Sequence, residues 1–523
     1  MKVCLDKLGA FAAAALLACT LSGAAQAAPS QAGPPQTDGP SPSPSAPTQG
    51  SKQPEPETHM TRQQAKELFR SVSEILTFAS EDSQLPIRRE VKRRLITREQ
   101  VQKYVLDRFH EDKGAKRMER EEIVLKKFGL LDRDFHLQPF LVSLLTEQIA
   151  AFYDNKTRTV NLLDWVSPEE QKPVIAHELT HALQDQHTDL DKWEPDTPDK
   201  VSKTVAEDNQ MLAIDERDTA RDAVLEGQAM AVYMDYTLRN SGKTLRTLPD
   251  VGDDMESSDD SSPVMARAPK LLQESLLFPY RDGLEFEQTL LKDKGPQYAF
   301  AGVLDRPPSS SYEIMNARAY EREQSVPLLR MPDVHPLLDA GYEPYDIGVM
   351  GELDVKILAG LFGGEAAAAA LTPQWNGGLY YVAQSKSAKT AEQRASTASL
   401  CLLYLSAWRN EASAAEFAKM YGRQIGVKYS GVERDSAAET TPDEKIYRTN
   451  EGPVLIVREG KQVFISESFD LDLARKLQFL LLGAQQGDAT QIVATQERPV
   501  HDPIVPLVRF MSNAGVMKSA LLH

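Results

Sequence analysis

Cysteine is scarce in this sequence, with three residues among 523. Cys4 and Cys19 lie in the N-terminal leader, so that only Cys401 remains once the leader is removed. A chain with one cysteine forms no internal disulfide bond, and Cys401, in the apolar run SLCLLYL, is expected to be a small buried side chain. The fold must therefore be stabilised by packing, and by a bound metal if the chain has one.

Long hydrophobic runs are also missing. The apolar run from Leu8 to Ala18 is shorter than the roughly 20 residues that a transmembrane helix needs, and we expect no transmembrane segment. A weakly positive start precedes this run, and Ala25-Gln26-Ala27 follows it, which predicts a signal peptide over residues 1–27, cleaved after Ala27. A second interpretation is a lipoprotein signal, LLAC, with a lipid anchor at Cys19. Either interpretation predicts export, to the periplasm or the cell exterior.

Positive charge is in deficit, with 59 Lys and Arg residues against 76 Asp and Glu residues and a formal net charge of −17. This balance argues against a nucleic-acid-binding protein, which usually presents a basic face. One basic run, IRREVKRRLITR at 87–98, stands out locally. We interpret it as the solvated face of a helix.

The composition, 41% hydrophobic and 26% charged, is that of a soluble globular protein, and the length favours more than one domain. Residues 28–60 are rich in Pro, Ser, Gln and Gly and predict a disordered linker. Residues 61–344 are expected to hold a helical N-terminal part and a catalytic core. Residues 345–523 predict a C-terminal α+β subdomain, so that the expected fold class is α+β.

Hydrophobic periodicity predicts the main elements. Apolar residues three and four apart predict helices within 61–149, 217–240, 268–294, 413–425 and 472–483. Alternating or continuous apolar runs predict two short strands within 150–166, further strands at 379–384 and 400–408, and a hairpin at 452–466. The acidic stretch 253–263 is expected to be an exposed loop.

The sequence HELTH, from His177 to His181, is the strongest chemical signal in the chain. Ser167 with Glu170 three residues later predicts a helix start just before it, although Pro173 could delay the regular helix. On a helix, residues four apart share a face, so that both imidazoles can bind one metal ion. Glu178 then lies close enough to take a proton from water that the metal activates. This spacing predicts metal-assisted hydrolysis, most simply with Zn²⁺.

The motif supplies two ligands, and two residues compete to be the third. His187 stands six residues after His181, but a continuing helix would turn it roughly 80° away from His177. Glu226, in DAVLEGQAMA on the next predicted helix, would complete a His₂Glu set. The neighbouring Gly227 is costly within a helix and suggests close approach of another backbone.

Residues around a metal-bound histidine usually orient its ring. Asp185, one turn after His181, and Asp222, one turn before Glu226, are the candidates for that role, and each could equally be a solvated carboxylate. A donor that stabilises the transition state is not assigned by the sequence. The candidates considered are Tyr233, Tyr236, Tyr298 and His335.

HELTH followed by LEGQA resembles the gluzincin metallopeptidases, and the run from residue 150 to His187 is similar to secreted bacterial proteins with a peptidase-MA-like zincin domain. The resemblance covers roughly residues 140–240. It implies His177, His181 and Glu226 as zinc ligands, Glu178 as general base, and 157–163 as a sheet edge along which substrate lies. Leu225 stands where that branch often has Asn, and the spacing from His181 to Glu226 is longer than usual.

We therefore expect a secreted zinc metallopeptidase that hydrolyses peptide or protein substrates. Two alternatives remain open. One is a zincin-fold envelope module that binds a ligand without turnover, and the intact Glu178 speaks against it. The other is a zinc amidase that acts on a non-protein substrate such as the cell wall. The sequence does not indicate the oligomeric state.

Overall fold

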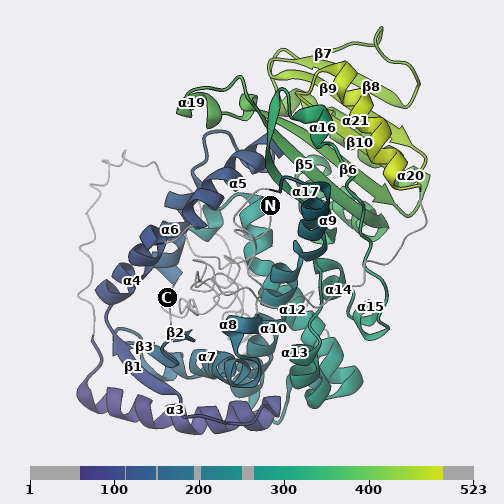
Figure 1. Cartoon of the computed structure of the whole chain (residues 1–523). Helices are drawn as coiled ribbons and strands as arrows, with labels where there is room; N and C mark the ends of the chain where they lie inside the picture. Colours follow the sequence, from purple (N-terminus) through teal and green to yellow (C-terminus); the bar gives the residue numbers. More distant parts are fainter. Residues whose placement is uncertain (1–58, 112–113, 149–150, 194–201, 250–263, 487–523) are drawn as a thin grey trace, which may run out of the picture.

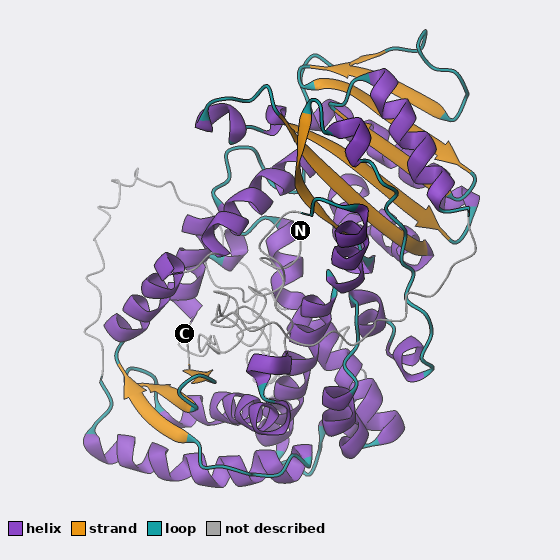
Figure 2. Cartoon of the chain, viewed as in Figure 1, coloured by secondary structure: helices purple, strands orange, loops and turns teal. Residues whose placement is uncertain are grey.

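The computed structural model describes residues 59–111, 114–148, 151–193, 202–249 and 264–486, and these form a mixed α and β fold with two sheets (Figure 2). The expected signal peptide, nearly all of the linker and the loop at 253–263 lie outside this range. Within it, none of the helices combines the length and the apolar character that crossing a membrane requires.

Helices dominate the chain up to residue 338. The elements that lead to the HExxH motif are α3 (Arg62–Ser83), β1 (Lys92–Ile96), α4 (Arg98–Glu111), α5 (Gly114–Phe128), α6 (Leu137–Gln148), β2 (Ala151–Asp154) and β3 (Thr159–Leu163). Those that carry and follow it are α7 (Pro168–Thr188), α8 (Leu190–Trp193), α9 (Val205–Ile214), α10 (Arg217–Leu238), η2 (Leu245–Thr247), η3 (Met265–Arg267), α12 (Lys270–Lys294), η4 (Tyr298–Gly302), α13 (Val303–Asp305), α14 (Ser311–Met315), α15 (Ala317–Glu321) and α16 (His335–Leu338).

The smaller sheet has the strand order β1-β3-β2, with β1 parallel and β2 antiparallel to β3. Two expectations were wrong here. Residues 87–98 do not form a helix face, because Lys92–Ile96 is the edge strand β1, whose exposed Lys92 and Arg94 are typical of edge protection. Residues 157–163 are not a sheet edge, because β3 is paired on both sides. The free edge beside α7 belongs to β2.

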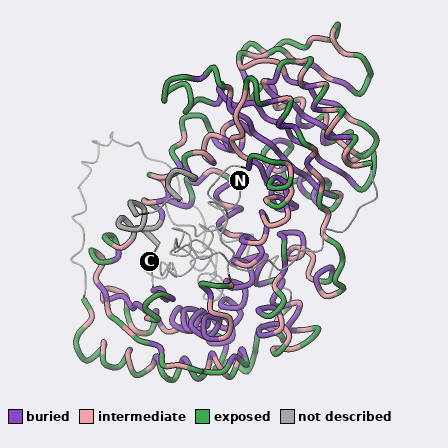
Figure 3. Tube along the Cα trace, viewed as in Figure 1, coloured by how far each residue is buried: buried purple, intermediate pink, exposed green. Residues whose placement is uncertain are grey.

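The motif helix α7 begins where the capping signal predicts. The Ser167 side chain accepts a hydrogen bond from the Glu170 backbone N–H, and the Glu170 carboxylate accepts one from the Ser167 N–H. Pro168 occupies the first turn, where its missing N–H has no cost, and the helix continues through Pro173. Nearly every residue from Val174 to Gln186 is buried, so that α7 is a core helix (Figure 3).

Helix α10 lies between α7 and α12 and packs against both, while α3 runs beneath α7 (Figure 1). The predicted close approach at Gly227 is confirmed: a Cβ there would collide with the carbonyl group of Gly283 in α12. A Cβ on Gly283 would in turn collide with the carbonyl oxygen of Ala223. This glycine pair brings the backbones of α10 and α12 together, and so brings α12 side chains close to Glu226.

The C-terminal part is built on a second sheet. Its elements are β4 (Tyr342–Val349), α17 (Glu352–Gly363), α18 (Glu365–Leu371), η5 (Thr372–Gln374), β5 (Trp375–Ser385), α19 (Ala391–Arg394), η6 (Thr397–Ser399), β6 (Leu400–Trp408), α20 (Glu411–Lys428), β7 (Glu433–Arg434), β8 (Glu444–Thr449), β9 (Gly452–Glu459), β10 (Gln462–Glu467) and α21 (Leu471–Ala484). The strands are antiparallel in the order β4-β5-β6-β10-β9-β8-β7. Helices α17 and α20 cover one face, and α16 and α21 cover the other.

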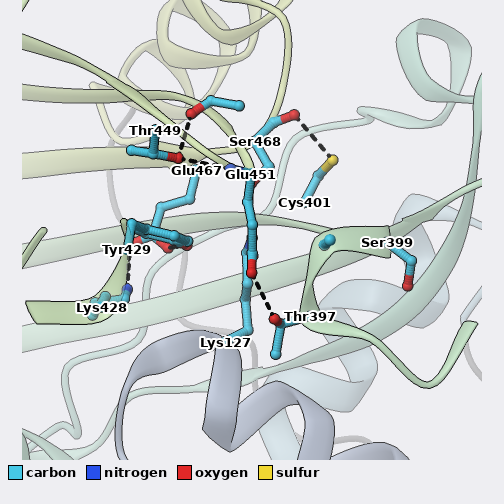
Figure 4. A network of polar contacts seen from close by, with 12 residues as sticks. Lys127, Thr397, Ser399, Cys401, Lys428, Tyr429, Thr449, Glu451, Glu467 and Ser468 are labelled. Carbon is cyan, nitrogen blue, oxygen red and sulfur yellow. Dashed lines mark hydrogen bonds and ion pairs between the residues drawn. The ribbon is translucent and has the colours of Figure 1, made fainter. Parts of the chain in front are cut away.

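A buried ionic cluster joins α5 to this sheet (Figure 4). The ammonium group of Lys127, on α5, lies 3.0 Å from Glu451 Oε2 and donates to Ser468 Oγ over 2.7 Å. Lys428 forms a second buried ion pair with Glu467, at 2.5 Å. Tyr421 and Tyr429 both donate to the Glu467 carboxylate. The N-terminal helix α5 is therefore held against the C-terminal sheet by the buried ion pair between Lys127 and Glu451.

Candidate metal centre

His177 and His181 project from one face of α7 toward Glu226 on α10, in the arrangement expected of the His₂Glu set rather than of the set with His187. His177 Nε2 lies 3.1 Å from Glu226 Oε2 and 3.1 Å from His181 Nε2, and His181 Nε2 lies 3.6 Å from the same Glu226 oxygen. All three side chains are buried. Within the described residues this is the one group of three or more His, Cys, Asp or Glu side chains with the spacing of a metal site.

These distances suit a metal ion. Ligand atoms bound tetrahedrally to zinc at about 2.0–2.1 Å lie about 3.3–3.5 Å from one another. Glu226 Oε2 faces the two imidazole nitrogens, but neither of the buried Glu226 carboxylate oxygens makes a hydrogen bond of good geometry among the described residues. Two imidazoles and one carboxylate form the usual donor set of a catalytic zinc site, which keeps its fourth position for water or substrate.

The protonation of the two imidazoles differs. Burial lowers the pKa of His177. Burial acts in the same direction on His181, but the Glu226 carboxylate outweighs it and raises the pKa of His181 to about 9. A proton on His181 Nε2 therefore competes with a metal ion for this position. Metal affinity is accordingly expected to fall as the solution becomes acidic.

Glu178 follows His177 in the motif, and its two carboxylate oxygens differ in their contacts. Its Oε2 accepts a 2.8 Å hydrogen bond from the backbone N–H of Tyr153 in β2, while its buried Oε1 has no partner among the described residues. Burial raises the pKa of Glu178 to about 8. A cation bound nearby would favour the charged carboxylate again. One oxygen is thus anchored by the sheet, and the other is available for proton transfer.

Asp185 does not orient a histidine ring. Its Oδ2 accepts from the Tyr153 hydroxyl over 2.9 Å, and its Oδ1 accepts from the Leu190 backbone N–H just after α7. Tyr153 therefore contacts α7 twice, through its backbone at Glu178 and through its side chain at Asp185. The partner of the His181 ring is instead Gln184, whose Oε1 lies 2.8 Å from His181 Nδ1.

Four further residues that the sequence suggested for the site are His187, Asp222, Tyr298 and His335, and most of them bind other partners. His187 points away from the centre and pairs with Asp305 at 2.9 Å, which removes it as the third ligand in this arrangement. Asp222 is buried one turn before Glu226, and its charge contributes to raising the pKa of a tyrosine, Tyr280, on α12. Tyr298 binds Arg306, and His335 pairs with Asp208, so that both have partners of their own.

Tyr280 is a site residue that the sequence reasoning missed. Its ring stacks beside His177, with the centroids 6.3 Å apart. Its buried hydroxyl has no hydrogen bond of good geometry among the described residues, and burial together with the charges of Glu226 and Glu178 holds its pKa well above the usual range. Only the glycine contact between α10 and α12 brings Tyr280 here, and the motif helix itself gives no sign of it.

A separate cavity of about 1070 Å³ lies at the start of α10, between Glu216, Arg217 and the segment that ends at Arg330. None of the three ligand residues or Glu178 lines it. The candidate metal centre is thus distinct from this cavity, and among the described elements α7, α10, α12 and β2 contribute its side chains and contacts.

No family model, no curated protein and no solved structure matches this chain.

Proposed function

We propose that the chain is a secreted zinc-dependent metallopeptidase with a zincin-like core. The observation that carries the proposal is the convergence of His177, His181 and Glu226 within 4.8 Å of one another, next to a glutamate with a free carboxylate oxygen. The choice of zinc follows from the His₂Glu donor set. Export follows from the signal sequence expected at residues 1–27.

A zinc ion held by these ligands would polarise the scissile carbonyl group and lower the pKa of a bound water toward neutrality. Glu178 Oε1 would accept a proton from the attacking water, whose oxygen would form the bond to the carbonyl carbon. The same carboxyl group would pass that proton to the leaving nitrogen as the C–N bond breaks. Tyr280 keeps its proton because of its raised pKa, and can donate a hydrogen bond to the oxygen that becomes negative.

Two features of the site favour turnover over a role in binding alone. Glu178 is buried without an ion pair among the described residues, although the charge of His181 acts on it, and burying such a group is costly. The backbone N–H of Tyr153, in the edge strand β2, donates a hydrogen bond to Glu178 Oε2 and so fixes the position of the Glu178 carboxylate. A module that only binds ligands has no need for either arrangement.

The test is to incubate the zinc-loaded mature chain with a diverse peptide mixture and to identify products by mass spectrometry. The Glu178→Ala variant serves as the comparison, because it should keep zinc and lose at least about 10³-fold in rate if general-base catalysis is required. Zinc content is measured in both proteins. Cleavage by wild type alone supports the peptidase proposal and reveals its preference.

A second incubation, with cell-wall fragments, separates the alternatives. Release of new amines from the fragments without peptide cleavage would assign the centre to a non-protein amide. Absence of both reactions in zinc-loaded protein would contradict an enzymatic role and favour a binding module.

A further inference from the structure

A chain of buried amides leads away from His181. Gln184 Oε1 meets His181 Nδ1 at 2.8 Å, and Gln184 Nε2 donates to the Leu225 carbonyl over 3.0 Å and to Gln228 Oε1 over 2.9 Å. Gln228 Nε2 then donates to the carbonyl oxygens of Ala299 and Phe300 in η4, over 2.9 and 3.1 Å. Both glutamine side chains are fully buried. Three segments, α7, α10 and η4, are therefore linked to one imidazole.

The direction of this chain is determined at its far end. A backbone carbonyl oxygen only accepts hydrogen bonds, so that Gln228 must present its NH₂ group to η4 and its Oε1 to Gln184. Gln184 must then donate with Nε2, which the Leu225 carbonyl also requires. Its Oε1 therefore faces His181, and the His181 Nδ1 must be the donor. Reversing either amide would place two acceptors or two donors against each other.

We propose that Gln184 and Gln228 form a positioning relay that holds His181 in the Nδ1–H tautomer, with the lone pair of Nε2 directed at the metal. The inference relies on the metal centre assigned under the proposed function. The relay adds Gln228 to the residues that support the metal centre. The hydrogen bonds of the Gln228 side chain are to Gln184, Ala299 and Phe300, not to His177, His181, Glu226 or Glu178. The inference also gives a role to η4, a wide π-helical turn whose carbonyls anchor the relay.

The relay uses a neutral acceptor where a carboxylate is also common beside a metal-bound histidine. A carboxylate at position 184 could not donate to the Leu225 carbonyl or to Gln228 Oε1. The amide does both tasks at once, accepting from the imidazole and donating to two oxygens of α10. A glutamine at this position therefore uses both its oxygen and its nitrogen in hydrogen bonds without burying another negative charge next to Glu226.

Zinc affinity measured by chelator competition tests the relay, because it needs no substrate. Gln184→Met should weaken zinc binding by about 10–100-fold and Gln228→Met by about tenfold, as loss of outer contacts to a ligand typically does. The matched control is Gln288→Met. Gln288 is an equally buried glutamine on α12 that donates to the Leu245 and Pro249 carbonyls, outside the relay. It should lower thermal stability and leave zinc affinity unchanged.

The double variant Gln184→Met/Gln228→Met distinguishes a relay from two separate structural effects. If Gln228 acts through Gln184, the double variant should bind zinc within about twofold of Gln184→Met alone, since interacting residues are not additive. Losses that add, or a Gln228→Met protein that binds zinc like wild type, would overturn the inference. In ¹H spectra of the zinc form, the slowly exchanging ring N–H of His181 should also disappear in both single variants.

The outcome also separates this inference from the proposed function. Zinc binding that is insensitive to both glutamines removes the relay and leaves the peptidase proposal standing. Sensitive zinc binding without hydrolysis of any substrate supports the relay and removes the peptidase. A wild-type chain that binds no zinc contradicts both.

Discussion

Glu226 completes the candidate metal centre that the two histidines of α7 begin, and it comes from a different helix. Replacing it with Ala should lower zinc affinity by more than about 100-fold, because outer-shell changes alone cost 10–100-fold. The matched variant is His187→Ala, which alters the rival ligand at the end of α7. Because His187 pairs with Asp305, that variant should bind zinc as wild type does, and weaker binding would return His187 to the ligand set.

Glu287 on α12 is a second residue with a testable consequence. It is buried, neither carboxylate oxygen has a partner among the described residues, and burial raises its pKa well above the usual value. A folded-state pKa above the unfolded one means that stability is complete below the unfolded pKa and is lost as the pH rises toward the folded pKa. Each pKa unit of separation corresponds to about 1.4 kcal/mol.

Glu287→Gln should therefore be more stable than wild type at pH 8, and this advantage should shrink as the pH falls toward 4. Urea unfolding at both pH values measures the difference. Asp293→Asn, an exposed change on the same helix, is the control and should show no such gain at pH 8. An advantage for Glu287→Gln that is the same at both pH values would contradict a buried neutral carboxyl group.

At the scale of elements, the contact between α10 and α12 decides the shape of the metal centre. Gly227→Ala would push the two backbones apart, at a cost of about 1–3 kcal/mol or more, as overpacked cores show. Because Glu226 and Tyr280 lie beside the contact, zinc affinity should fall with stability. Gly426→Ala in α20, where an added methyl group meets nothing within 4 Å, should instead stabilise by about 0.5–1 kcal/mol. Calorimetry and chelator competition on both variants check this.

The elements around the motif could be predicted from local signals, and the outcome shows which signals suffice. The capping pair Ser167 and Glu170 correctly predicted the start of α7. Gly227, which is unfavourable within a helix, correctly predicted that another backbone lies close to α10. The strand β1 was missed because it contains mainly Lys and Arg, which resemble a solvated helix when pairing is unknown. Strand β4 was missed as well, since Pro344 interrupts its pattern and a bulge absorbs it.

Site residues that depend on packing were beyond local reasoning. Tyr280 reaches the centre only through the contact of Gly283 with α10, and nothing near residue 280 in the sequence points to it. Asp185 was assigned to a histidine ring because helical spacing allows it, but the Tyr153 hydroxyl from β2 competes for it. Gln184 contacts His181 from one turn along α7, and helical spacing alone does not distinguish it from Asp185 as the partner of that ring.

At the scale of the whole molecule, the ionic cluster around Lys127 connects the N-terminal helices to the C-terminal sheet. Lys127→Met would leave Glu451 buried with its charge only partly compensated by Arg133. Removing one partner of a buried pair typically costs about 3–5 kcal/mol. Chemical unfolding should show this loss, whereas Lys192→Met, which removes an exposed pair with Asp189, should change stability little. Similar losses in both variants would mean that the cluster does not connect the two parts energetically.

Cys401 lies in β6, flanked by β5 and β10, and its thiol is buried with a pKa raised by burial to about 12. A thiol reagent can modify Cys401 only when the sheet opens. In the closed sheet the reagent cannot reach the thiol, and burial keeps the thiol in its unreactive protonated form. In the mature chain, which the sequence leaves with this one thiol, the labelling rate would count sheet openings, while the rate of zinc release counts openings of the metal centre. If Cys401 labelling and zinc release have equal rates, the C-terminal sheet and the candidate metal centre open in the same cooperative event. Faster zinc release would mean that the candidate metal centre opens without the sheet.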